Sequence, residues 1–119
     1  MNFELILQTK DHNPHYLNRY ISFIHLRTNR TEIEHGELHH ICPKAPDLFP
    51  QYSSFKDHLW NSIKLTHREH YIAHKLLAKA FGKSQLFAFW AMCTKQSRNS
   101  KRKYKVSPRD YELAKLTLS

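Results

Sequence analysis

The spacing of apolar positions in the first quarter of the chain predicts an amphipathic helix. Between residues 13 and 27 the apolar side chains recur every three or four positions, which places them on one helix face. Asn13 followed by Pro14 is typical of a helix N-cap and first helical position. The short apolar stretch at 3–7 fits either a strand or a helical turn, and the pattern does not decide between them.

A second helical pattern lies in the middle of the chain and has clear ends. Thr66 and Glu69 have the spacing of a capping box, which marks a helix start. Apolar positions then recur at helical spacing from about His67 to Phe81, where Gly82 provides a stop. A further helix rich in aromatic residues is predicted from roughly 84 to 94.

Two short segments before the central helix have the pattern of β-strands. Residues 38–42 are partly β-branched and end at Pro43, as an edge strand does. Residues 60–65 alternate apolar and polar side chains, which suits a second strand pairing back onto the first. The loop between them, 43–58, is long, and long loops inside compact domains are usually functional.

These elements predict an α+β fold. It consists of a small antiparallel β-hairpin with a long loop, packed on a helix within a mainly helical single domain. A chain of 119 residues fits one domain. It is expected to contain an N-terminal helix at about 13–27 and a hairpin-plus-helix unit at 37–82. C-terminal helices with a basic segment follow at 84–118.

Composition excludes several classes of protein. The chain is 40% hydrophobic and 24% charged, which excludes wholesale disorder, and no apolar run approaches the ~18 residues of a membrane span. The first ten residues contain Glu4 and lack the basic start of a secretory signal. Two cysteines, Cys42 and Cys93, exclude a disulfide framework and a cysteine-based zinc ribbon. We therefore expect a cytoplasmic protein with no membrane association.

The charge balance points to a polyanionic partner. Lys and Arg number 19 against 10 Asp and Glu, a net charge of +9, and such an excess favours nucleic acid. A basic run at 95–105 precedes a short helix predicted over 107–116. We expect the basic side chains of this run to contact DNA phosphates: Lys95, Arg98, Lys101, Arg102, Lys103 and Lys105.

Histidine is unusually frequent and clustered. Of ten histidines, seven fall within one stretch of about forty residues: His35, His39, His40, His58, His67, His70 and His74. Imidazole is the usual ligand of transition metals and the usual general base near neutral pH. The pattern therefore indicates a metal-assisted or histidine-assisted event on a polyanion.

The spacing of four of these histidines suggests one site. His70 and His74 are four residues apart on the predicted helix, so both can address one ion. His39 and His40 are adjacent on the predicted strand and point to opposite sides. One of them can complete a three-histidine metal site while its neighbour faces the substrate. Three protein ligands leave positions open for water and phosphate, which is typical of catalytic sites.

Three segments in this order resemble the ββα-metal motif of HNH endonucleases: ELHHICP at 37–43, NSIKLT at 61–66 and REHYIAH at 68–74. The small phage-type, homing-endonuclease-like group of that family has the matching pattern HHIxP, NxxxLT and xEHxxxH. The chain departs from many relatives at 44–50, where KAPDLFP stands in place of paired glycines.

The resemblance implies a role for each matching residue. His40 takes the place of the general base, which removes a proton from the attacking water. Asn61 takes the place of the asparagine that fixes the loop, orients the base and in some relatives ligates the metal. The implied metal ligands are His39, His70 and His74.

Two neighbours of the helix histidines have open roles. Arg68 can stabilise phosphate charge on bound DNA or be an exposed helix residue. Glu69 can complete the helix cap, or it can accept a hydrogen bond from a ligating imidazole and fix its tautomer.

The residues and the resemblance together imply a divalent-metal-dependent DNA endonuclease of HNH type that hydrolyses phosphodiester bonds with one metal ion. Mg²⁺ or Mn²⁺ suits the function, whereas three imidazoles favour Zn²⁺ or Ni²⁺ in a crystal. Two alternatives stay open: a non-catalytic nucleic-acid-binding module with a structural metal, and an HNH accessory protein of phage DNA packaging. We expect no small-molecule cofactor, and action as a homodimer or with a protein partner stays open.

Overall fold

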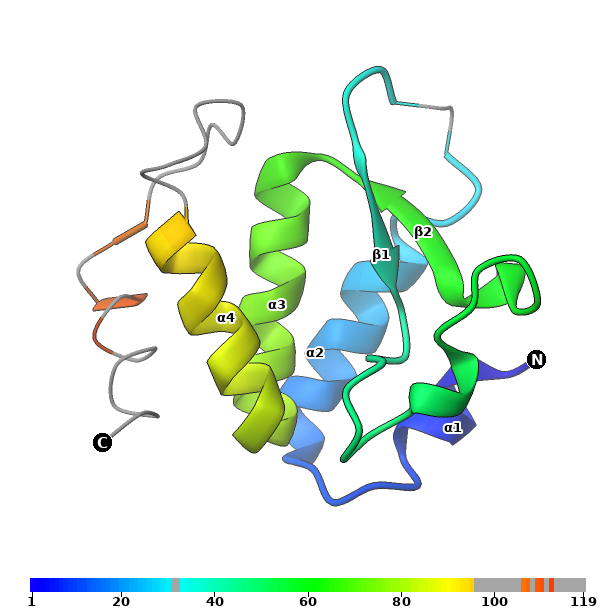
Figure 1. Cartoon of the computed structure of the whole chain (residues 1–119), viewed down its shortest axis with the longest axis horizontal. Helices are drawn as coiled ribbons and strands as arrows, with labels where there is room; N and C mark the ends of the chain where they lie inside the picture. Colours follow the sequence, from blue (N-terminus) through cyan, green and yellow to red (C-terminus); the bar gives the residue numbers. More distant parts are fainter. Residues whose placement is uncertain (31–32, 96–105, 108, 111, 113–119) are drawn as a thin grey trace.

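The fold is α+β, as predicted, with a small two-stranded sheet that lies beside the helices (Figure 1). The computed structural model describes residues 1–30, 33–95, 106, 107, 109, 110 and 112. Over these residues the helices are α1 (Phe3–Leu7), α2 (Pro14–His25), α3 (His67–Phe81) and α4 (Lys83–Lys95), and the strands are β1 (Glu37–His40) and β2 (Ser62–Leu65). None of the described helices is long and apolar enough to cross a membrane.

Side-chain caps define the starts of the two N-terminal helices. The Asn2 side chain accepts hydrogen bonds from the backbone amides of Glu4 and Leu5, so residues 3–7 form a helical turn rather than a strand. Asn13 accepts from the Tyr16 amide at 3.2 Å, and Pro14 occupies the first position of α2. The predicted helix at 13–27 is confirmed, with its end two residues earlier.

The central helix α3 has the predicted ends. Thr66 Oγ1 accepts from the Glu69 amide at 3.1 Å, and the Glu69 carboxylate accepts from the Thr66 amide at 2.9 Å, which completes the capping box. Gly82 ends the helix at φ +65°, a conformation that a side chain would strain. The chain reverses there, so α4 packs back along α3.

Both strands of the hairpin are shorter than predicted at the end that adjoins the long loop. β1 and β2 are antiparallel, with His39 opposite Ile63 and His40 opposite Ser62. The predicted strand 60–65 begins only at Ser62, because residues 59–61 form a 3₁₀ turn. The predicted strand 38–42 ends at His40, because the Asn61 side chain replaces a paired strand beside Cys42.

Helix α3 lies in the middle of the molecule, between α2 and α4 (Figure 1). The larger apolar core joins α2, α3 and the hairpin through residues such as Leu17, Ile24 and Leu77. A smaller cluster around Phe89 packs α4 against α3. The N-terminal half of α3 therefore faces β1, and the packing of α2 and α4 against α3 fixes its position.

Asp110, in the C-terminal segment, is bound to two side chains of α3. Asp110 Oδ2 accepts from the Tyr71 hydroxyl at 2.6 Å, and Oδ1 is paired with Lys75 at 2.7 Å, both on α3. These bonds lower the pKa of Asp110 despite its burial. Ser107 Oγ accepts from the Asp110 amide, as a cap does. Most of the helix predicted over 107–116 lies outside the described residues.

Candidate metal centre and active site

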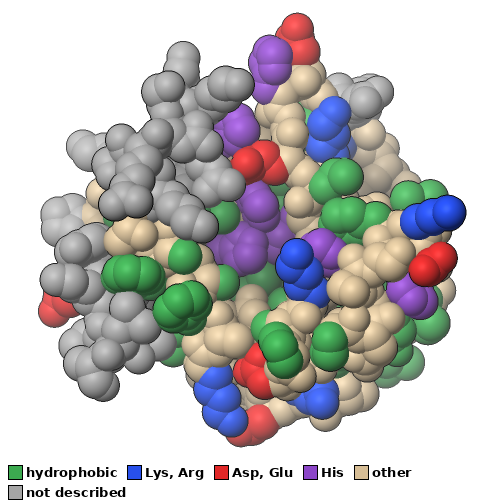
Figure 2. Space-filling view, viewed as in Figure 1, with side chains coloured by type: hydrophobic (Ala, Val, Ile, Leu, Met, Phe, Trp, Pro, Cys, Tyr) green, Lys and Arg blue, Asp and Glu red, His purple; other side chains and the backbone are tan. Residues whose placement is uncertain are grey.

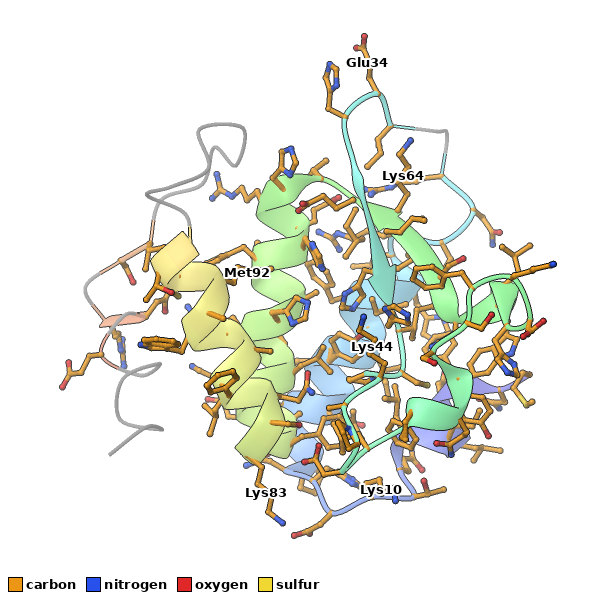
Figure 3. All side chains as sticks on the ribbon, in the orientation of Figure 1. Lys10, Glu34, Lys44, Lys64, Lys83 and Met92 are labelled. Atoms are coloured by element: carbon orange, nitrogen blue, oxygen red, sulfur yellow. The ribbon has the colours of Figure 1, made fainter. Side chains whose placement is uncertain are left out.

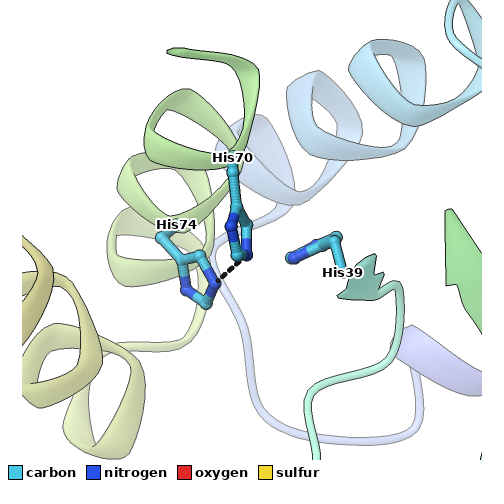
Figure 4. A group of neighbouring side chains, drawn as sticks. All are labelled: His39, His70 and His74. Carbon is cyan, nitrogen blue, oxygen red and sulfur yellow. Dashed lines mark hydrogen bonds between the residues drawn. The ribbon is translucent and has the colours of Figure 1, made fainter. Parts of the chain in front are cut away.

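Three histidines from two elements come together at the junction of β1 and α3. One ring nitrogen each of His39, His70 and His74 lies within 4.8 Å of the others (Figure 4). His70 and His74 sit one turn apart on α3, with their Nε2 atoms 3.1 Å apart. His39, on β1, is 2% exposed, and its ring centroid is 5.1 Å from each of theirs. These are the three residues predicted as metal ligands, and a divalent ion fits their donor set.

The environment of His39 keeps its imidazole neutral. Burial lowers the pKa of His39 well below its ordinary value, and the neighbouring His74 and His70 lower it further. A neutral imidazole has one unprotonated nitrogen, which is the form that binds metals. His39 can therefore offer an unprotonated nitrogen to a metal ion.

Tyr20 fixes which nitrogen of His39 carries the proton. The Tyr20 hydroxyl donates to the Ile41 carbonyl at 2.7 Å, so its oxygen is an acceptor for His39 Nε2, 2.8 Å away. His39 Nε2 then carries the hydrogen and Nδ1 keeps the lone pair. Burial raises the pKa of Tyr20, which keeps this hydroxyl protonated. Sequence analysis did not find Tyr20, which lies on α2, nineteen residues before His39.

Glu37, rather than Glu69, is the carboxylate that lies beside an imidazole of the cluster. Its Oε1 lies 3.1 Å from Nδ1 of His70 and 3.1 Å from Nδ1 of His67. A hydrogen on His70 Nδ1 leaves Nε2 as the ligand atom, which faces His74. The signal was present in the sequence, because Glu37 and His39 are two apart on a strand and share one face.

Glu69 is bound instead by two arginines of the segment after α2. Arg27 Nε donates to Oε2 at 2.9 Å, and Arg30 donates to both carboxylate oxygens at 2.7 Å. The hydrogen bond from Arg30 and the capping bond from Thr66 are among the causes that lower the pKa of Glu69 to about 2. The interpretation of Glu69 as a partner of an imidazole is wrong, and its capping interpretation is confirmed.

His40 faces away from His39, as the pleat requires. Its Nε2 is 2.8 Å from the Ser53 carbonyl, which can only accept, so Nε2 carries the hydrogen and Nδ1 is an acceptor. The ring stacks on Phe55 with centroids 4.0 Å apart and planes 22° apart. Both contacts come from the long loop between the strands. The loop therefore holds His40 in one orientation, in which Nδ1 is the ring nitrogen that can accept a proton.

Asn61 holds the ends of the long loop together. It is fully buried, and its side chain accepts from the Cys42 amide at 2.6 Å and donates to the carbonyls of Cys42 and Tyr52 at 3.1 Å. Among the described contacts, its amide bonds backbone groups rather than His40 or the three clustered histidines. Asn61 thus fixes the two ends of the loop that contacts His40.

The base candidate and two of the metal-ligand candidates line one cleft. A cavity of about 410 Å³ between β1, α3, α4 and the loop after β1 is lined by His40, His70 and His74, together with Lys44 and Gln85. Figure 2 shows the histidine side chains gathered in this hollow with a basic side chain beside them, and Figure 3 labels Lys44 there.

Of the side chains predicted to contact DNA, the described residues include that of Arg68 alone. Arg68 is exposed in the first turn of α3. Lys95 ends α4, but its side chain lies outside the described residues, as do the other basic positions of the predicted run: Arg98, Lys101, Arg102, Lys103 and Lys105.

The chain is similar to two proteins of Enterobacteria phage T4. It is 40% identical over 83 residues to "Probable mobile endonuclease E", covering 69% of this chain and 53% of that protein. It is 39% identical over 79 residues to "Probable mobile endonuclease C", covering 66% of this chain and 31% of that protein. The chain thus spans about half the length, or less, of these curated relatives. No family model matches the chain, and no solved structure matches it.

Proposed function

We propose that the chain is a divalent-metal-dependent DNA endonuclease of the HNH type, which hydrolyses phosphodiester bonds with His40 as general base. The observation that carries the proposal is the division of labour between adjacent strand residues. His39 joins the three-histidine cluster, whereas His40 lies against the long loop and lines the same cleft. The similarity to proteins named mobile endonucleases supports the endonuclease part of this proposal.

One metal ion would be held by His39, His70 and His74. The donor set fits, because Tyr20 and Glu37 each bond the ring nitrogen that is not needed for the ion. A bound divalent ion supplies Lewis-acid polarisation of a phosphate oxygen and stabilises the leaving 3′-oxygen. Three imidazoles favour Zn²⁺, Ni²⁺, Mn²⁺ or Co²⁺ over Mg²⁺, which prefers oxygen ligands.

His40 acts on the attacking water. Its Nδ1 takes a proton from the water as the water oxygen bonds to phosphorus, and the bond from phosphorus to the 3′-oxygen breaks in line. The products carry a 5′-phosphate and a 3′-hydroxyl. The Ser53 carbonyl stabilises the imidazolium that forms, because it accepts the Nε2 hydrogen throughout. Phe55 keeps the ring from rotating out of this bond.

The alternative module with a structural metal requires a closed coordination shell. The cluster that the described residues form has three members, which leaves positions for water and phosphate. An accessory protein of DNA packaging would use the same site, so it differs from the endonuclease in its partner rather than in its chemistry.

A supercoiled plasmid incubated with Mg²⁺, Mn²⁺, Zn²⁺, Ni²⁺ or Co²⁺ tests the proposal. Nicked or linear product should appear with at least one ion and disappear on chelation. His74→Ala should lose the activity, and His12→Ala, at a histidine outside the cluster, should retain it. A protein that binds the plasmid but leaves it supercoiled with every ion would instead be the non-catalytic module.

A further inference from the structure

The cleft beside the histidine cluster has more room than metal and water need. Its volume of about 410 Å³ lies in the range of small-molecule sites, roughly 300–1,000 Å³. Beyond the histidines, its walls are mostly apolar, and Leu38, Ala45 and Ala88 contribute from three elements. An apolar wall with a few polar groups is typical of a pocket that holds an organic ligand in one orientation.

Gln85, on the first turn of α4, is a buried polar side chain that the catalytic proposal does not use. It is 3% exposed and lines the cleft. Its Nε2 donates to Ser84 Oγ at 3.2 Å, and within the described residues this is the single hydrogen bond of its amide. The carbonyl oxygen and a second N–H of the amide are therefore available to a ligand.

Lys44 brings positive charge to the part of the cleft wall that the loop after β1 forms. It follows β1 by four residues and is exposed, and no acidic side chain pairs with it among the residues that the structure describes. Figure 3 shows Lys44 between α3 and the chain that follows β1. An ammonium group in this position attracts a phosphate that approaches the histidines.

We propose that this cleft is a subsite for the nucleotide next to the scissile phosphate. Lys44 binds its phosphate, the apolar wall contacts its sugar and base face, and the Gln85 amide hydrogen-bonds the base edge. An amide offers a donor and an acceptor side by side, so it discriminates between bases. The choice of ligand rests on the proposed nuclease function. Gln85 then sets a base preference beside the cut.

Titration of the metal-free full chain with the four deoxynucleoside 5′-monophosphates tests the subsite without any need for cleavage. Amide resonances of Ala45 and Ala88 and the side-chain amide of Gln85 should shift in NMR spectra. The four affinities should differ by about fivefold or more, which is the lower limit expected for one good base contact. Inorganic phosphate should shift resonances near Lys44 but leave the Gln85 side chain unmoved.

Two substitutions separate the parts of the subsite. Gln85→Met keeps the volume and removes the hydrogen bonds, so the four affinities should become equal. Lys44→Gln should weaken all four by a similar factor, on the order of tenfold. Gln51→Met and Lys10→Gln, both exposed and away from the cleft, are the matched controls. If Gln85→Met disturbs the spectrum as a whole, Gln85→Asn retains the amide on a shorter arm and should also alter the ratios.

The proposal is overturned if the nucleotides bind no more tightly than inorganic phosphate, which would leave an anion site alone. It is also overturned if Gln85→Met and Gln85→Asn keep the wild-type ratios among the four nucleotides. These results are independent of the plasmid experiment, so a failed subsite and a failed nuclease are distinguishable.

Discussion

Two carboxylates near the start of α3 show how similar groups serve different ends. Glu69 accepts hydrogen bonds from Arg27, Arg30 and the Thr66 amide, so its oxygens are committed to the fold. Glu37 lies against the imidazoles of His67 and His70. A carboxylate held by guanidinium groups stabilises the structure, whereas one beside an imidazole determines which ring nitrogen can bind a metal. The neighbouring hydrogen-bond donor therefore decides the role of each carboxylate.

The largest effect in this comparison should follow from Glu69→Ala. It leaves two half-buried arginines without their carboxylate and removes one side of the capping box. The free energy of unfolding should fall by about 2 kcal/mol, because charge-assisted hydrogen bonds are lost at a partly exposed site. Urea denaturation measures this. Glu34→Ala, at an exposed carboxylate, should stay within about 0.5 kcal/mol of wild type. Equal, small losses in both variants would contradict the structural role of Glu69.

Glu37→Ala should weaken metal binding more than it weakens the fold. Without the carboxylate, His70 loses the acceptor that directs its Nε2 toward the cluster. Loss of such a partner typically costs about 10–100-fold in metal affinity. Calorimetric titration with Zn²⁺ and urea denaturation of the same samples separate the two effects. Wild-type affinity in Glu37→Ala would show that the carboxylate does not orient the ligand.

Tyr20→Phe should have the smallest effect of the three. It removes one hydroxyl, and with it the partners of His39 Nε2 and the Ile41 carbonyl. We expect a loss of about 1–2 kcal/mol in unfolding free energy, as for an unsatisfied buried group. Nitrogen chemical shifts of His39 should show a mixture of tautomers. Tyr16→Phe, on the same helix, is the control and should leave the His39 tautomer unchanged. A single, unchanged tautomer in Tyr20→Phe would remove Tyr20 from the site.

Local patterns predicted the helices and the pairing of His70 with His74 because these features depend on spacings within one element. The capping box at Thr66 and the i, i+4 pair on α3 are of this kind. The addition of His39, which lies on β1, rested on the resemblance to HNH endonucleases. The end of the first strand and the start of the second were each wrong by two residues, because a buried asparagine side chain and a 3₁₀ turn replaced the ladder there.

The supporting contacts were not predictable in the same way. Tyr20 reaches His39 from α2, and Ser53 reaches His40 from a loop thirteen residues away. Such contacts depend on how elements pack, which apolar periodicity does not specify. Gln85 illustrates the same limit, because only the packing of α4 on α3 brings it to the cleft. The roles of the site residues and the single-domain organisation stay predictions.

The central claim is that two adjacent histidines on β1 divide the work, and His40→Ala tests it most directly. Metal affinity and plasmid cleavage should be measured on the same preparation. The account predicts that Zn²⁺ binding is unchanged, because His40 bonds Ser53 rather than joining the cluster, while cleavage falls by about 10²–10⁴-fold, the usual contribution of a general base. A variant that loses its metal, or that cuts at the wild-type rate, would contradict the assignment.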